Sequence, residues 1–251
     1  MDVEKQVYAF SPELIEGIIV KRKNRFIFVV EIGDIAYECH CPVTGSIGNI
    51  IFDAIPCLLS KSQGAARKTP YTVEAISLDP PGTENKTWVG INQNLVNRYA
   101  ENAFRGGMLA NVIDGGDTIL REQVLGNSKL DFRIGGTYIE VKTPLSEIQL
   151  PAGPHIVKKK AADALGPNRF LRHIGELSDS LGPHNKAILL VCFIYDNPRF
   201  TRPAQTKNSG TVRGVVAASV ARGVEIWQVN FELTPSGVRL ARHFEITADF
   251  A

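Results

Sequence analysis

The first 80 residues alternate short runs of β-branched and aromatic residues with polar turns, a pattern that predicts β-strands. The predicted strands cover residues 15–20, 25–32, 35–40 and 72–77. Gly33-Asp34 predicts a hairpin turn between the second strand and the third. About five short strands with basic loops favour a small barrel. We therefore predict an OB-type barrel over residues 1–80.

The pattern changes after the stiff connector Asp79-Pro80-Pro81-Gly82-Thr83. Helices are predicted over residues 95–104, 169–180 and 212–222, and further strands over residues 119–124, 187–195, 224–233 and 238–246. Asn92 or Asn94 is a candidate N-cap for the first helix. The nearly continuous apolar run 187–195 is typical of a strand buried on both faces. Residues 81–251 are therefore expected to form a second domain, a mixed sheet flanked by helices, which makes the chain α/β (α+β).

One predicted hairpin carries the candidate chemistry. Gly135-Gly136 is a two-residue turn signal between two alternating runs that together cover residues 128–142. With that turn, Asp131 is predicted to lie directly opposite Glu140. Because side chains alternate along a strand, Asp131, Glu140 and Lys142 are expected to share one face.

Two carboxylates on facing strand positions, with Cβ atoms roughly 4.5–5.5 Å apart, repel each other. A divalent cation offsets that repulsion, since hard cations bind carboxylate oxygens. Lys142 adds a positive charge at the same place. A metal-binding carboxylate pair beside a lysine is the minimal set for hydrolysing a phosphodiester. The alternative is a solvated hairpin face on which Lys142 only neutralises its neighbours.

Composition narrows the class of protein. Of 251 residues, 44% are hydrophobic and 22% are charged, as in soluble globular proteins. No apolar run has the length of a membrane span and the first residues do not form a signal peptide, so we expect a cytoplasmic protein without a membrane partner. Four cysteines do not indicate a disulfide scaffold. Cys39-His40-Cys41 lacks a second group at zinc spacing and fits the end of a strand.

The net charge of +2 says little about partners, but the basic residues are clustered. The candidate nucleic-acid-binding residues are Lys21, Arg22, Lys23, Arg25, Lys61, Arg67 and Lys68, and a further cluster covers residues 158–160. Each cluster alone fits a solvated turn, whereas three in one near-neutral chain favour phosphate binding. Phe26, Phe28 and Tyr37 are candidates for stacking on bases, with the barrel core as the alternative.

The chain resembles the sugar fermentation stimulation protein family, known as SfsA, over residues 14–246. The segments that carry the resemblance are Gly17-Ile18-Ile19-Val20-Lys21-Arg22, Cys41-Pro42-Val43-Thr44-Gly45-Ser46, Arg67-Lys68-Thr69-Pro70-Tyr71-Thr72, Val89-Gly90-Ile91-Asn92, Arg121-Glu122-Gln123-Val124, Ser128-Lys129-Leu130-Asp131-Phe132, Tyr138-Ile139-Glu140-Val141-Lys142, His173-Ile174-Gly175-Glu176-Leu177 and Thr234-Pro235-Ser236-Gly237. The resemblance implies an N-terminal OB-type domain, a C-terminal domain like the PD-(D/E)XK nucleases, and DNA binding or DNA/RNA nuclease activity.

By this resemblance Asp131, Glu140 and Lys142 occupy the nuclease motif, and Glu101 occupies the first-helix acid that often completes the metal site. We expect Mg²⁺ or Mn²⁺ to be held by Asp131, Glu140, Glu101 and the carbonyl of Val141, and Asp131, Glu140 and Lys142 to be catalytic. The expected partner is DNA or RNA. The alternative function is a non-catalytic DNA-binding transcriptional regulator on a nuclease-like scaffold, and a homodimer stays open.

The sequence departs from the family pattern after Lys142. Family members usually show Phe-Pro-Asp-Ala where this chain has Leu150-Pro151-Ala152-Gly153. The family's Lys-His pair is Arg172-His173 here, and the glycine before it is Phe170. The candidate metal residues are retained.

Overall fold

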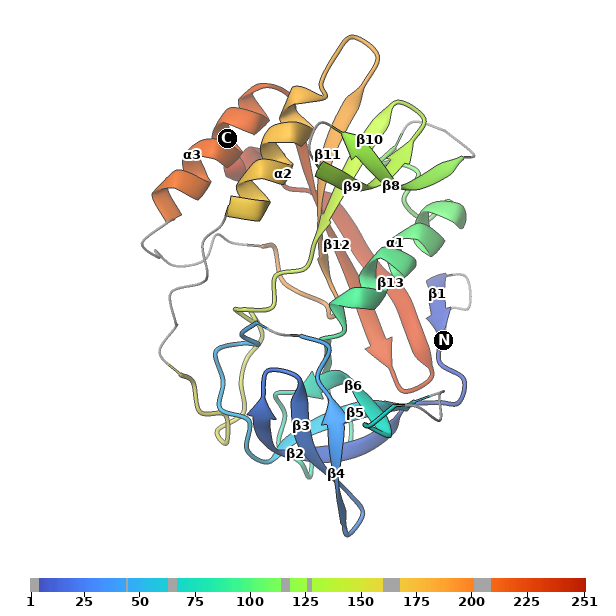
Figure 1. Ribbon diagram of the computed structural model, residues 1–251, viewed down its shortest axis with the longest axis vertical. Helices are drawn as coiled ribbons and strands as arrows, with labels where there is room; N and C mark the ends of the chain where they lie inside the picture. Colours follow the sequence, from blue (N-terminus) through green and yellow to red (C-terminus); the bar gives the residue numbers. More distant parts are fainter. Residues whose placement is uncertain are drawn as a thin grey trace.

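The protein is described by a computed structural model over residues 5–43, 45–62, 67–113, 118–125, 128–159, 168–200 and 209–251. Within these residues the strands form one sheet of six and one of seven. In Figure 1 the first sheet is the barrel at the bottom, and the second rises above it with helices on both sides. The fold is therefore α+β, with the predicted order of a barrel followed by a mixed sheet.

The barrel contains most of the N-terminal strands. They are β2 (Ile15–Asn24), β3 (Ile27–Ile32), β4 (Ile35–His40), β5 (Ile55–Lys61), β6 (Tyr71–Ser77) and β7 (Trp88–Gly90). They run in the order β4-β3-β2-β5-β6-β7, and a further pairing of β4 with β6 closes β2 to β6 into a barrel. The predicted OB-type barrel is confirmed, and closure leaves few free strand edges.

The candidate stacking aromatics have different positions in this barrel. Phe28 is fully buried and packs against Phe52, with ring centroids 4.9 Å apart, so it belongs to the core. Phe26 is 44% exposed, and the guanidinium of Arg25 lies 4.7 Å from its ring centroid. Tyr37 is half-buried and packs edge-on against the ring of Tyr71.

The second sheet combines both ends of the chain. Its strands are β1 (Gln6–Ala9), β8 (Ile119–Leu125), β9 (Ser128–Ile134), β10 (Thr137–Lys142), β11 (Lys186–Phe193), β12 (Glu225–Thr234) and β13 (Gly237–Glu245). Their order is β1-β13-β12-β11-β10-β9-β8, with β10–β11 and β11–β12 parallel and the other pairs antiparallel. The helices are α1 (Val96–Arg105), α2 (Asn168–Asp179) and α3 (Ser209–Ala221), with short 3-10 turns η2 (Gln93–Leu95) and η3 (Thr247–Phe250).

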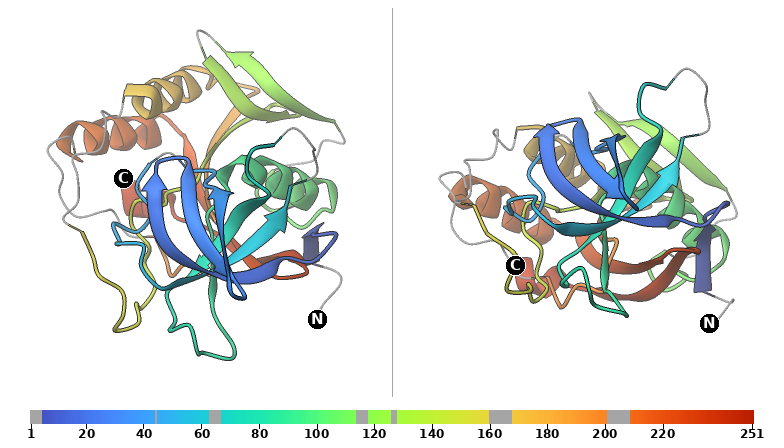
Figure 2. Two further views of the ribbon diagram at one scale, coloured as in Figure 1. Left: turned by 60° about the horizontal axis from the view of Figure 1, so that its bottom comes forward. Right: turned by 90° about the horizontal axis from the view of Figure 1, so that it is seen from below.

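The helices cover opposite faces of this sheet. Ile188 and Leu190 of β11 belong to the apolar cluster that contains the buried residues of α1. Leu189 and Val191 belong to the cluster that contains the buried residues of α2 and α3. Because alternate residues of a strand point to opposite faces, α1 lies on one face and α2 and α3 on the other. Figure 2 shows α2 and α3 side by side, away from α1.

Two local predictions differ from the structure. The side chain of Asn92 donates to Glu74 instead of capping α1, whose N-cap is Leu95 with no side-chain hydrogen bond. The division at residue 80 does not follow the sheets, because β1 pairs with β13 of the second sheet and β7 pairs with β6 of the barrel.

The barrel packs tightly on the second sheet. The N–H of Gly90, at the end of β7, donates to the carbonyl of Ile194 at 2.8 Å. A Cβ at position 90 would lie 2.2 Å from Cγ2 of Ile194, so only glycine fits there. The side chain of Gln93 then donates to the carbonyl of Thr143, just beyond β10. These contacts place the barrel beside the end of the candidate hairpin.

Candidate functional site

The predicted hairpin forms with the predicted register as far as Phe132, which faces Ile139. The next predicted pair, Asp131 opposite Glu140, is absent from the ladder. Instead, Oδ2 of Asp131 accepts the backbone N–H of Val141 at 2.8 Å. The carboxylate therefore takes the place of a strand carbonyl, where β9 separates from β10.

The backbone of β9 is irregular at this point. Leu130 packs in the cluster of α2, and Phe132 packs in the cluster of α1, although regular alternation would put both on one face. Opposite, on β8, Glu122 has φ +51°, a left-handed conformation that costs a non-glycine residue about 1–2 kcal/mol. The expectation that Asp131 shares a face with Glu140 is wrong, because this break turns its carboxylate into the gap between the strands.

The other oxygen of Asp131 contacts α1. Oδ1 accepts Nδ2 of Asn97 at 2.7 Å, so each oxygen of the carboxylate has one N–H donor. Each oxygen also has a second lone pair that these bonds leave free. The contacts fix the direction of the carboxylate without neutralising its charge.

Glu140 is the buried acid of the site, with 2% of its surface exposed. Its Oε1 contacts Nζ of Lys142 and lies 2.5 Å from Nδ1 of His173 on α2. Its Oε2 is buried and has no hydrogen-bond partner within the described residues. An unpaired buried carboxylate oxygen is costly, so this atom is suited to a cation.

His173 was not among the predicted site residues, although the Arg172-His173 pair stands out as a departure from the family pattern. The signal in the sequence is spacing: His173 lies next to Ile174 and four residues before Leu177, which puts it on the apolar face of a helix, and all three residues are buried. A histidine on the inner face above a strand with an acid is placed to pair with that acid.

Lys142 is less enclosed, with 31% of its side chain exposed.

Glu101 is engaged elsewhere. One carboxylate oxygen lies 2.8 Å from Arg105 of the same helix and the other lies 3.4 Å from Arg121 of β8. Across the described ranges, no three His, Cys, Asp or Glu side chains gather into a metal-binding group. The predicted set of Glu101, Asp131 and Glu140 is thus not assembled, and Asn97, one turn earlier on α1, is the helix residue that reaches Asp131.

The predicted basic residues divide into two groups. Lys21, Arg25, Lys61, Arg67 and Lys68 are exposed. Arg22 donates to the carbonyls of Val43, Gly45 and Arg25 and so fixes a loop, and Lys23 forms an ion pair with Glu38. Of the third cluster, residues 158 and 159 are exposed, and Lys160 lies outside the described residues.

A pocket of about 340 Å³ lies between the barrel and the start of α1. Its lining includes Tyr8, His40, Lys61, Arg67, Glu74 and Asn92. Glu74 is 4% exposed and accepts hydrogen bonds from Ser60 at 2.6 Å and Asn92 at 2.7 Å. Burial raises the pKa of Glu74, although these two hydrogen bonds oppose the shift. The signal in the sequence was an acid inside the otherwise uncharged strand β6.

The fold and these contacts define a class of α+β protein, an OB barrel joined to a mixed sheet that carries a buried acid, lysine and histidine cluster. Residues 20–91 match the family described as the SfsA N-terminal OB domain. A sugar fermentation stimulation protein homolog of Synechocystis sp. is 32% identical over 91% of this chain and 93% of its own length. The homolog of Pseudomonas syringae pv. tomato is 31% identical over 94% of this chain and 98% of its own length. The chain belongs to the SfsA family.

A solved structure supports the fold over nearly the whole chain. The structure of Pyrococcus furiosus SfsA in complex with Ca²⁺ matches with a TM-score of 0.72 and 20% identity, covering 95% of this chain and 97% of that one. Among the helices within the described ranges, none is long and apolar enough to cross a membrane.

Proposed function

We propose that this protein is a metal-dependent nuclease that hydrolyses phosphodiester bonds in DNA or RNA. The observation that carries the proposal is the buried Glu140, whose Oε1 contacts Lys142 and His173 while Oε2 has no hydrogen-bond partner in the described part of the chain. The carboxylate of Asp131 is bonded to the adjacent backbone at Val141. The Ca²⁺ complex of the Pyrococcus relative supports a divalent cation in this family.

The donor set fits a hard cation. Asp131, Glu140 and the carbonyl of Val141 offer oxygen atoms only, as Mg²⁺ and Mn²⁺ prefer. Because Asp131 bonds to α1 and Glu140 to α2, on opposite faces of the sheet, a cation shared by both acids needs one carboxylate to turn toward the other, with water completing the coordination. A cation bound there would polarise a phosphoryl oxygen and lower the pKa of a water molecule. Glu101 is not needed for this set.

The protein's own residues orient and balance the charges. Asn97 and the Val141 N–H hold Asp131 in one direction, and His173 holds Glu140. Lys142 contacts Glu140 and still reaches solvent, so its ammonium can stabilise negative charge that develops on a phosphate. The exposed Lys21, Arg25, Lys61, Arg67 and Lys68 support nucleic acid as the partner.

A second candidate function is DNA binding without catalysis. The observation that favours it is the pairing of Glu101 with Arg105 and Arg121, which removes the helix acid from the site. A regulator on this scaffold would bind nucleic acid and leave it intact.

The test is incubation of labelled single-stranded and double-stranded DNA and RNA with the purified protein in Mn²⁺, Mg²⁺ or EDTA. We expect product from the parent with Mn²⁺ or Mg²⁺ and none with EDTA. Glu140→Gln keeps the side-chain shape and removes the charge, so it should abolish cleavage while binding persists. The matched control is Glu147→Gln, which removes an exposed acid. Equal product from the parent and Glu140→Gln would refute the assignment, and binding without cleavage by the parent would favour the regulator.

A further inference from the structure

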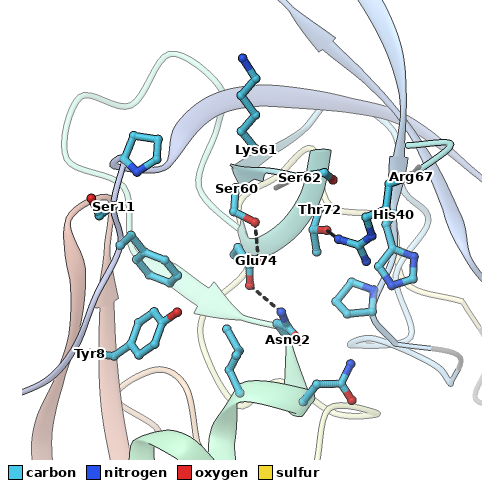
Figure 3. A pocket seen from close by; sticks show the side chains of 15 residues that line it. Tyr8, Ser11, His40, Ser60, Lys61, Ser62, Arg67, Thr72, Glu74 and Asn92 are labelled. Atoms are coloured by element: carbon cyan, nitrogen blue, oxygen red, sulfur yellow. Dashed lines mark hydrogen bonds between the residues drawn. The ribbon is translucent and has the colours of Figure 1, made fainter. Parts of the chain in front are cut away.

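The pocket between the barrel and α1 is chemically organised. Figure 3 shows Glu74 between Ser60 and Asn92, with Tyr8 on one side and His40 and Arg67 on the other. A volume of about 340 Å³ lies near the lower end of small-molecule sites, roughly 300–1,000 Å³. The pocket therefore suits a ligand of the size of one nucleotide.

One part of the lining is cationic. Lys61 and Arg67 are exposed and line the pocket, and Arg67 also donates to the hydroxyl of Thr72 at 3.3 Å. Burial and the charge of Arg67 lower the pKa of His40, which favours the neutral form of its ring. Arg67 beside the hydroxyl of Thr72 is suited to a phosphate, and Lys61, whose side chain extends away from Glu74 in Figure 3, adds positive charge nearby.

Asn92 presents a polar atom that the fold leaves unpaired. Its Nδ2 donates to Oε2 of Glu74 at 2.7 Å, which fixes the direction of the amide. The residue is 9% exposed, and its Oδ1 is buried without a hydrogen-bond partner in the described part of the chain. Leaving a buried acceptor unsatisfied costs about 1–3 kcal/mol. A ligand with an N–H group, such as the edge of a nucleobase, would satisfy Oδ1.

An aromatic wall lies on the same pocket. Tyr8 and Phe10 line it, with ring centroids 5.1 Å apart in an edge-on arrangement. Tyr8 also packs against Tyr99 of α1, so its ring is held in place. Aromatic faces bind unpaired bases by stacking, worth about 1–3 kcal/mol per base.

The pocket is joined to the acid site by a short piece of chain. Asn92, Asn94 and Leu95 line the pocket, and Asn97, in the first turn of α1, donates to Asp131. The same short segment, residues 92–97, therefore contacts both the pocket and Asp131.

We propose that this pocket binds one unpaired nucleotide, with its phosphate at Lys61 and Arg67, its base edge at Oδ1 of Asn92 and its ring against Tyr8. The inference deepens the proposed nuclease function. The role of the pocket in presenting a single strand to the acid site rests on that function. A free mononucleotide and a nucleotide within a strand share this chemistry.

The test measures binding in EDTA, where cleavage is absent. The probes are the nucleoside 5′-monophosphates, the matching nucleosides, inorganic phosphate and a single-stranded oligonucleotide. We expect at least one monophosphate to bind at least about tenfold more tightly than its nucleoside, which lacks the charge-assisted contacts. It should also bind at least about tenfold more tightly than phosphate, which lacks the base that stacks on Tyr8. Lys61→Ala and Arg67→Ala should each weaken that binding about tenfold. The control Arg222→Ala, which removes an exposed cation of the α3 end paired with Asp179, should leave it unchanged.

The different probes distinguish a free mononucleotide from a nucleotide within a strand. They also distinguish failure of the pocket proposal from failure of the nuclease proposal. Monophosphate binding with or without oligonucleotide binding supports the pocket, and the oligonucleotide arm shows whether a strand uses it. Oligonucleotide binding without any monophosphate binding, or equal binding of phosphate and monophosphates, would overturn the proposal. So would equal losses in Lys61→Ala and Arg222→Ala. A parent that binds monophosphates but makes no product in Mn²⁺ would refute the nuclease and leave the pocket standing.

Discussion

Asn97 of α1 donates its side-chain amide to Oδ1 of Asp131, 2.7 Å away. Glu101, one turn further along the helix, is bound by Arg105 and Arg121 instead. The helix therefore presents a neutral donor to the acid of β9. This arrangement tolerates Asp131 without a cation, because the amide donates to one oxygen of the carboxylate and adds no negative charge.

Asn97→Asp should make the site depend on a cation. A second carboxylate would replace a donor within hydrogen-bonding distance of Asp131, so in EDTA we expect a loss of about 1–3 kcal/mol. Mn²⁺ should restore more stability to Asn97→Asp than to the parent, since a ligand that binds only the folded state stabilises it. Thermal unfolding with and without Mn²⁺ measures this.

The matched control is Asn102→Asp, also on α1. Asn102 donates to the backbone carbonyl of Val7 at 2.7 Å, so the change should also destabilise the protein. It places no acid beside Asp131, and Mn²⁺ should not rescue it. Equal rescue of both variants would contradict a cation site at Asp131.

His173→Ala should destabilise the fold through Glu140. Without the ring, Oε1 of the buried Glu140 keeps only Lys142 as a partner among the described residues, and we expect a loss of about 2–3 kcal/mol in urea unfolding. His173→Gln retains a donor and should cost less. In a Glu140→Gln background the charge is gone, so His173→Ala should cost clearly less than in the parent. Equal costs in the two backgrounds would show that His173 only fills space.

Gly90→Ala should weaken the junction of the barrel and the second sheet. The added Cβ would lie 2.2 Å from Cγ2 and 2.5 Å from Cβ of Ile194, and overpacking of this kind costs about 1–3 kcal/mol. Gly82→Ala meets no atom within 4 Å and should be neutral. Ile194→Ala should relieve part of the cost of Gly90→Ala. Strict additivity of these two changes, measured by urea unfolding, would argue against the clash.

The parts of the fold that could be predicted from sequence are those set by local patterns. Gly135-Gly136 predicted the hairpin and its register as far as Phe132 and Ile139, because a two-residue turn and side-chain alternation fix strand pairing. The helices α1, α2 and α3 lie within a few residues of their predicted positions. The barrel followed from short strands and turns.

The parts that could not be predicted depend on contacts between distant segments. Asp131 leaves the ladder because its carboxylate accepts from Val141 and from Asn97, 34 residues away along the chain. Asparagine often caps helices, but the side chain of Asn92 donates to Glu74 in the pocket. The short strand β1 was missed because its partner, β13, lies at the other end of the chain.

Glu74→Gln should change how stability depends on pH. Burial raises the pKa of Glu74 in the folded protein above its usual value of 4.5. Below that value the acid is protonated in both the folded and the unfolded states, so its charge costs nothing. As the pH rises above it, the unfolded chain releases the proton first, and the parent loses stability until the pH passes the folded pKa. Glutamine has no proton to lose, and it can still accept from Asn92 and donate to Ser60.

We therefore expect the stability of Glu74→Gln relative to the parent to increase as the pH rises from about 4.5 toward neutrality. Urea unfolding of both proteins across that range measures the difference, in which the other titrating groups cancel. Glu147→Gln, at an exposed acid, serves as the control, and its difference from the parent should stay nearly constant with pH. A constant difference for Glu74→Gln as well would mean that burial does not disfavour the Glu74 charge, and that the pocket floor is hydrated enough to hold a carboxylate at no cost.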